Sequence, residues 1–91
     1  MSAPSDQELV QASISGDSSA FRILVERYES QIAATVIGML GPGPEADDVG
    51  QETFIRFYNN LSKFRGESAL STYLIRIAIN LSLNAIKRRQ R

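Results

Sequence analysis

The chain has 91 residues, of which 43% are hydrophobic, 8% aromatic and 22% charged, and its formal net charge is zero. This composition is typical of one small soluble domain and excludes the disordered and fibrous classes. Cysteine and histidine are absent, which excludes disulfides, a zinc site of the usual kind and histidine acid–base chemistry, and we expect no cofactor. No window approaches the roughly 18 apolar residues that span a bilayer, so we expect a cytoplasmic protein.

Charge is unevenly distributed along the chain. Residues 1–52 hold two basic and nine acidic residues, whereas residues 53–91 hold eight basic residues and a single acid, Glu67. The basic half suits a polyanion such as nucleic acid, and the acidic half suits a partner of opposite sign. The alternative is that the two halves attract each other within the fold.

The first two predicted helices begin at recognisable capping residues. Ser5 followed by Glu8 is typical of a capping box and predicts a helix over about residues 5–15. Asp17 can cap a second, longer helix that ends at Gly41. The apolar residues of this helix recur at spacings of three and four: Phe21, Leu24, Val25, Tyr28, Ile32, Val36 and Met39.

The segment GPGPEADD is the clearest break in the chain, and a third helix is predicted after it, over about residues 44–62. Gly50 inside this helix costs about 1 kcal/mol relative to alanine and suggests the close approach of a neighbour. The apolar set of the helix is Val49, Phe54, Phe57, Tyr58 and Leu61. Since no strand-like alternation or linker occurs, we predict an all-α, compact bundle of about four helices, with residues 1–91 as one domain.

The segment LSTYLIRIAINLSLNAIKRR predicts a last helix that is mostly buried. At about 100° per residue its apolar residues form two stripes, the first being Leu70, Leu74, Ile77, Ala78, Leu81 and Ala85, and the second Ile75, Ile79 and Ile86. The remaining arc, here called the polar stripe, contains no acid and comprises Tyr73, Arg76, Asn80, Asn84, Lys87 and Arg91. Asparagine can read base edges, basic residues neutralise phosphates and tyrosine can stack on a base. The alternative is an ordinary solvated ridge.

The loop before this helix, KFRGES, alternates basic and aromatic residues and is followed by hydroxyl side chains. Such a loop could hold a base that has left the stack, using backbone groups together with Ser68, Ser71 and Thr72 as hydrogen-bonding groups. In the alternative interpretation, Phe64 is a core residue at the end of the third helix, and Ser68 or Ser71 caps the last helix.

Three segments in order resemble region 2 of bacterial RNA polymerase sigma factors of the extracytoplasmic-function (group four) class. They are DQELVQASISGDSSAFRILVERY, ADDVGQETFIRFYNNLSKFRGES and LSTYLIRIAINLSLNAIKRR, which cover nearly the whole chain. In that family the third helix docks on the clamp coiled coil of the largest polymerase subunit. The resemblance implies a polymerase-binding face made of Asp47, Asp48, Gln51, Glu52, Ile55, Arg56 and Asn59. The residues alone leave a simpler alternative, in which the acids complement the helix dipole.

Members of the family also trap a flipped base from the non-template strand of the promoter minus-ten element, in the loop that corresponds here to residues 64–71. They contact the flanking bases and phosphates from the last helix, and the resemblance extends the phosphate contacts to Arg89. The DNA-binding residues implied are Lys63, Phe64, Arg65, Gly66, Ser68, Ala69, Ser71, Thr72, Tyr73, Arg76, Asn80, Asn84, Lys87 and Arg88. Many members have phenylalanine, tryptophan and tyrosine where this chain has Leu70, Tyr73 and Ile75, which bears on strand opening but not on the fold.

The chain stops at KRRQR, where a full-length member of the family continues into a second helical domain that reads the minus-thirty-five element. We therefore expect a fragment that binds core polymerase and, weakly and with strong salt dependence, single-stranded promoter DNA. An anti-sigma factor is a further expected partner, and no membrane is involved.

Two alternatives belong to other classes of protein. The first is a helical protein–protein adaptor whose basic end touches an acidic partner. The second is an enzyme, which needs paired carboxylates or an activated nucleophile. Asp47 and Asp48 are adjacent and point about 100° apart on a helix, so they cannot act on one atom. We therefore expect a binding protein without covalent chemistry.

Overall fold

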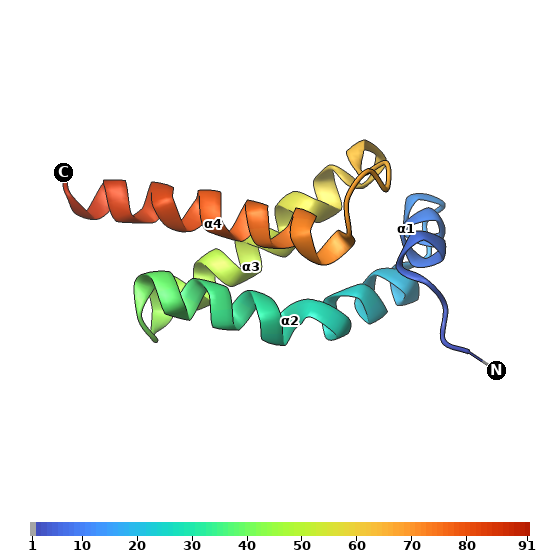
Figure 1. The fold of residues 1–91 in the computed structure, drawn as a ribbon, viewed down its shortest axis with the longest axis horizontal. Helices are drawn as coiled ribbons and strands as arrows, with labels where there is room; N and C mark the ends of the chain where they lie inside the picture. Colours follow the sequence, from blue (N-terminus) through green and yellow to red (C-terminus); the bar gives the residue numbers. More distant parts are fainter. Residues whose placement is uncertain (1) are drawn as a thin grey trace.

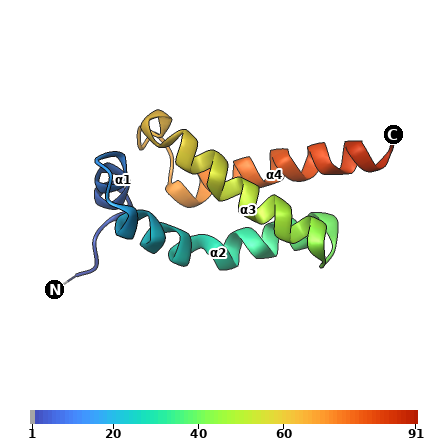
Figure 2. The same cartoon turned by 180° about the vertical axis from the view of Figure 1, so that it is seen from behind.

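The computed structural model describes residues 2–91, which form four α-helices and one short 3-10 helix without any strand. The elements are α1 (Asp6–Ile14), α2 (Ser18–Leu40), α3 (Pro44–Asn59), η1 (Leu61–Lys63) and α4 (Leu70–Arg89). Three long helices lie along the 47 Å length of the molecule, and α1 packs at the amino-terminal end of α2 (Figure 1). Figure 2 shows α3 crossing the other side of the α2–α4 pair. The predicted all-α fold is confirmed.

The capping residues predicted from the sequence begin the first two helices. The backbone N–H of Glu8 donates to Ser5 Oγ at 3.1 Å, and the N–H of Ser5 donates to Glu8 Oε1 at 3.3 Å. Asp17 Oδ1 accepts from the N–H groups of Ser19 and Ala20 at 2.9 and 3.2 Å. Each cap satisfies amide groups that have no partner within the helix, which fixes where the helix starts.

The end of the third helix and its glycine differ from expectation. The helix ends at Asn59, three residues early, because the chain tightens into the 3-10 turn η1. A Cβ atom built on Gly50 would lie 3.9 Å from Val36 Cγ2, which is an ordinary contact distance. The expected close approach of a neighbour is therefore wrong, and packing does not require a glycine there.

The core joins all four α-helices. Leu24, Ile32, Phe57 and Leu74 each expose 1% or less of their surface. The first apolar stripe of α4 is buried as predicted at Leu70, Leu74, Ala78, Leu81 and Ala85, with Ile77 half-buried. Side-chain burial thus holds α4 with one fixed side toward the other helices.

The second apolar stripe of α4 is not buried as predicted. Ile75 and Ile86 are half-buried, Ile79 is 36% exposed, and the neighbouring Leu83 is 45% exposed. The other helices lie on one side of α4 only (Figure 1). The edge of its apolar arc is therefore left in solvent. Ser82 lies in the middle of the buried arc, and its Oγ has no hydrogen-bond partner in the described structure.

Tyr58 was assigned to the apolar face of the third helix, and this prediction is wrong. Its side chain is 56% exposed and contacts Phe21 edge-on, with ring centroids 5.0 Å apart. Phe57, the preceding residue, takes the buried place and stacks on Phe21 at 5.8 Å. Helical periodicity assigned both neighbours to one face, whereas only Phe57 faces the centre of the bundle.

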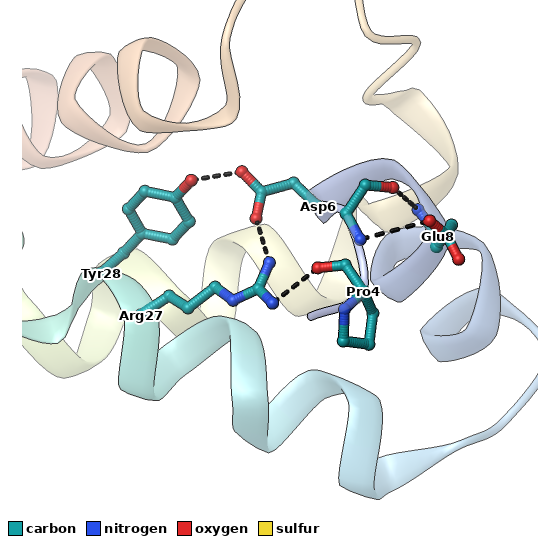
Figure 3. A network of polar contacts seen from close by, with 6 residues as sticks. Pro4, Asp6, Glu8, Arg27 and Tyr28 are labelled. Carbon is teal, nitrogen blue, oxygen red and sulfur yellow. Dashed lines mark hydrogen bonds and ion pairs between the residues drawn. The ribbon is translucent and has the colours of Figure 1, made fainter. Parts of the chain in front are cut away.

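A polar network joins the amino-terminal segment to α2 (Figure 3). Arg27 Nη1 pairs with Asp6 Oδ1 at 3.0 Å, and Arg27 Nη2 donates to the Pro4 carbonyl at 2.6 Å. The Tyr28 hydroxyl donates to the other carboxylate oxygen of Asp6. Partial burial, and then the hydrogen bond to Asp6, raise the pKa of Tyr28 from 10.0 to about 12. The network fixes α1 on α2 by contacts between residues about 20 apart in the chain.

Candidate nucleic-acid interface

The loop between α3 and α4 is anchored by a buried residue and an aromatic cluster. Leu61 in η1 is 7% exposed and holds the start of the loop against the core. Phe64 packs on Tyr73 with ring centroids 5.1 Å apart, and Tyr73 in turn meets Phe57 at 6.1 Å. Both aromatic residues of the loop region are half-buried. Phe64 therefore contacts the core, as the alternative interpretation held, and also keeps part of its ring at the surface.

Gly66 gives the loop its turn. Its φ of 74° lies in the left-handed region that side chains with a Cβ rarely adopt. This turn allows the chain to reverse between Arg65 and Glu67 and bring the loop back to the start of α4.

An open hollow of about 360 Å³ lies between the loop and the start of α4. Its lining is two aromatic residues, three basic residues, one acid and one hydroxyl, namely Phe64, Tyr73, Lys63, Arg65, Arg76, Glu67 and Ser68. All of these except Glu67 are among the DNA-binding residues predicted from the sequence. Glu67 was missed because it is the only acid of a basic segment. The sequence signal that could have identified Glu67 as a residue of this site is its place inside the KFRGES loop.

The start of α4 has no side-chain cap. Its N-cap residue is Ala69, and no side-chain hydrogen bond caps the helix. The alternative role of Ser68 or Ser71 as a cap is therefore wrong, because the helix begins at Leu70, two residues after Ser68 and one before Ser71. Ser71 is half-buried and Thr72 is exposed at the edge of the loop.

The polar stripe of α4 is accessible beyond the hollow. Arg76, Asn80, Asn84 and Lys87 are exposed, and Tyr73 is half-buried at the start of the stripe. Arg76 belongs both to the stripe and to the lining of the hollow, so that the two surfaces are continuous. A strand lying along this edge would meet two amide groups and positive charge, with the exposed Ile79 and Leu83 beside them.

The predicted polymerase-binding residues are divided between the two sides of α3. Asp48, Glu52 and Arg56 line a groove of about 330 Å³ toward α4, which they share with Asn84 and Arg88. Asp47 and Gln51 line a second groove of about 400 Å³ toward α2, together with Val25, Glu29, Ile32, Ala33, Val36, Ile37, Ala46, Gly50 and Phe54. Ile55, on the outer surface of α3, is 52% exposed, and Arg56 and Asn59 are exposed.

Arg89 lies apart from the other basic residues at the end of α4. Lys87 and Arg88 are exposed, whereas Arg89 pairs with Glu45 of α3 and donates to the Leu40 carbonyl. The Arg89 side chain is still 46% exposed beside Glu45, and the expectation that it meets DNA phosphate stays a prediction. The contact also shows that the two oppositely charged halves of the chain attract each other at one point within the fold.

No helix within residues 2–91 is long and apolar enough to cross a membrane. In the same part of the chain, the side chains of three or more acidic residues do not gather into a group that could hold a metal ion.

A family model described as sigma-70 region 2 matches residues 24–91. The chain therefore belongs to the sigma-70 region 2 family. It is 43% identical over 86 residues to the RNA polymerase sigma-H factor of Pseudomonas aeruginosa, covering 94% of this chain and 45% of that protein. It is 44% identical over 79 residues to the ECF RNA polymerase sigma-E factor of Escherichia coli K12, covering 87% of this chain and 41% of that protein.

A solved structure resembles this one along its whole length. It is an NMR structure of an engineered region 2 of sigmaE in complex with GTAAAA, with a TM-score of 0.88 and 38% sequence identity, covering 100% of this chain and 96% of that one. The recognition made from the sequence is thus confirmed. The chain spans less than half the length of the two curated relatives.

Proposed function

We propose that this domain docks on the RNA polymerase core and captures the non-template strand of the promoter minus-ten element. The observation that carries the proposal is the hollow, in which two aromatic rings lie among three cations and which continues into the polar stripe through Arg76. Family membership and the relative in complex with GTAAAA support the same assignment.

The lining of the hollow suits one extruded base. Phe64 and Tyr73 offer apolar contact that replaces part of the lost stacking, and Lys63, Arg65 and Arg76 attract the adjoining phosphates. Glu67 can accept a hydrogen bond from a base amino group. Its negative charge also repels a phosphate at the same point. Unpairing a base costs a few kcal/mol, which these contacts offset only when the base is outside the duplex. The domain would thus favour the melted state through binding energy, without covalent chemistry.

A titration with single strands tests the capture directly. Labelled GTAAAA and its complement TTTTAC are titrated with the domain at two salt concentrations, and anisotropy reports binding. We expect tighter binding of GTAAAA at both salt concentrations. Equal binding of both strands would contradict strand capture and favour the adaptor alternative, in which the basic surface attracts any acidic partner.

Docking on the polymerase is supported by the surface of α3. The exposed Ile55 lies on the same helix as Asp48 and Glu52, and a helical hairpin with basic and apolar side chains could cover all three. We expect Ile55→Arg to weaken binding to purified core polymerase at least about tenfold, because a charge in a docked apolar contact is desolvated. Ile23→Arg on α2, where the wild-type side chain is 38% exposed, is the matched control. Equal loss in both variants would contradict the assignment of the face.

Family membership supports two further inferences, one about a partner and one about location. An anti-sigma factor would silence the domain by covering the outer face of α3, and it should then compete with core polymerase for Ile55. Since polymerase and promoter DNA lie in the bacterial cytoplasm, we infer that the protein acts there. Competition binding between core polymerase and a candidate anti-sigma factor tests the first inference, and simultaneous binding of both would contradict it.

A further inference from the structure

Three consecutive basic residues end α4, and the structure gives them different surroundings. Lys87 and Arg88 are exposed and form no ion pair within residues 2–91. Arg89 turns back toward the connection between α2 and α3. Its Nε donates to Glu45 Oε1 at 2.7 Å, and its Nη2 donates to the Leu40 carbonyl at 2.9 Å as well as to Glu45.

The environment of the Arg89 guanidinium favours a cation for two reasons. Leu40 is the last residue of α2, where backbone carbonyls lack partners and the helix dipole is negative. α2 carries no basic residue in its own last turn, so α4 supplies this charge from outside. Glu45, in the first turn of α3, adds a full negative charge beside the same carbonyl. The planar guanidinium can donate to both acceptors at once, which an ammonium group does less well.

The last turns of α4 have little else to hold them. The end of α4 extends past the connection between α2 and α3 (Figure 1), and Ala85 is its last buried residue. Helix ends without packing fray readily, because tertiary contacts provide most of the stability of a helix in a protein. After Ile86, which is half-buried against the core, Arg89 is the residue that attaches this end to the body of the domain.

The rotation of these turns determines where two residues of the interface point. Asn84 and Arg88 are four residues apart, lie on one face of α4 and line the same groove beside Glu52. If the last turn unwound, Arg88 would lose its fixed place relative to Asn84, and a bound strand would have to order it again at an entropic cost.

We propose that Arg89, held by Glu45 and the Leu40 carbonyl, is a positioning residue that orders the end of α4 for DNA and does not itself bind phosphate. This inference rests on the proposed capture of a single strand. It assigns phosphate contact to Arg88 and Lys87 and gives Glu45, an acid, a role that favours binding of a polyanion.

The charge of Glu45 provides a sharp test. Removing an acid should strengthen binding to DNA if only net charge matters. We expect Glu45→Ala instead to weaken binding of GTAAAA by about two- to fivefold, the range that corresponds to an exposed ion pair. Glu26→Ala makes the same change of charge at an exposed residue of α2 and should leave binding unchanged or slightly tighter. Tighter binding by Glu45→Ala, equal to that of Glu26→Ala, would overturn the inference.

The salt dependence separates positioning from phosphate contact. Arg88→Ala should lower the slope of log affinity against log salt by about 0.7, the value for one contact to a single strand. Arg89→Ala should weaken binding without changing the slope, and Arg89→Lys should restore part of the loss. A slope reduced equally by Arg88→Ala and Arg89→Ala would show that Arg89 binds phosphate.

Amide hydrogen exchange tests the positioning role in the free protein. We expect Glu45→Ala and Arg89→Ala to speed exchange at residues 86–90 while leaving the core of α2 unchanged, and Glu26→Ala to have no effect. Unchanged exchange at residues 86–90 would overturn the inference even if DNA binds. If the wild-type domain shows no strand preference, the proposed function fails, and the exchange result still decides whether Arg89 orders the end of α4.

Discussion

Phe64 and Tyr73 pack against each other with ring centroids 5.1 Å apart and ring planes inclined by 57°. This contact joins the loop after α3 to the first turn of α4, and it forms the apolar part of the hollow. Because Tyr73 also contacts Phe57 in the core, the proposed base-binding surface is supported from below by the most buried aromatic residue of the domain. Stability and binding are therefore coupled at this point.

Replacing Phe64 by leucine should separate these two roles. Leucine keeps much of the apolar contact with Tyr73 but removes the aromatic face. We therefore expect the free energy of binding to GTAAAA to weaken by about 1–3 kcal/mol, while the melting temperature falls by only a few degrees. The matched control is Phe21→Leu, which removes a ring stacked on Phe57 at 5.8 Å, outside the hollow. It should lower stability and leave the affinity unchanged. Equal affinity for wild type and Phe64→Leu would contradict the proposed base contact.

Replacing Asn80 and replacing Arg88 should weaken DNA binding in different ways. We expect Asn80→Ala to weaken binding at particular bases, since an amide side chain can donate to and accept from a base edge. Arg88→Ala should weaken binding of every sequence about equally, because it removes a phosphate contact. Affinities for a set of single-base variants of GTAAAA measure both effects. Even losses across the set in both variants would rule out readout by Asn80.

Gly50→Ala should stabilise the domain by about 0.5–1 kcal/mol, because alanine is the better helix former and the added methyl group meets Val36 at an ordinary distance of 3.9 Å. Thermal and urea unfolding measure the change. Gly66→Ala is the contrasting variant, since φ at this residue is 74°, and it should be destabilising. A destabilised Gly50→Ala would show that the groove between α2 and α3 is narrower than the structure indicates.

Tyr28 should make stability depend on pH in the alkaline range. The folded state raises the pKa of Tyr28 from 10.0 to about 12, so the hydroxyl holds its proton more tightly when folded than when unfolded. The resulting stabilisation is fully present below about pH 10 and is lost as the pH rises through 12. Tyr28→Phe should cost about 1–2 kcal/mol at neutral pH.

The difference in unfolding free energy between wild type and Tyr28→Phe should accordingly shrink between pH 10 and 12. Tyr58→Phe, at a residue that is 56% exposed, is the matched control for the loss of a tyrosine hydroxyl. A difference that stays constant over this range would contradict the contact between Tyr28 and Asp6.

Features that depend on neighbouring residues in the chain were predictable. The capping box of Ser5 and Glu8, the Asp17 cap and the end of α2 at Gly41 each depend on side chains or backbone within a few residues. The first apolar stripe of α4 was predictable for a similar reason, because helical spacing fixes the direction of each side chain. The same spacing placed Arg76 and Asn80 on one exposed edge, as observed.

Features that depend on how helices cover one another were not predictable. Periodicity gives the direction of Tyr58 and Ile79 but not how far the neighbouring helices extend over them, and both are more exposed than expected. Arg89 and Glu45 are 44 residues apart. Their ion pair depends on the packing of α4 beside the connection between α2 and α3, which no local pattern in the sequence records.

Chemical-shift mapping by NMR, with the labelled domain titrated with GTAAAA, tests the central proposal most directly. We predict the largest shifts in residues 63–73 and at Arg76, Asn80 and Asn84, with much smaller shifts when the complement TTTTAC is added instead. Shifts that are confined to α1 and the start of α2, or that are the same for both strands, would contradict capture of a base by the hollow.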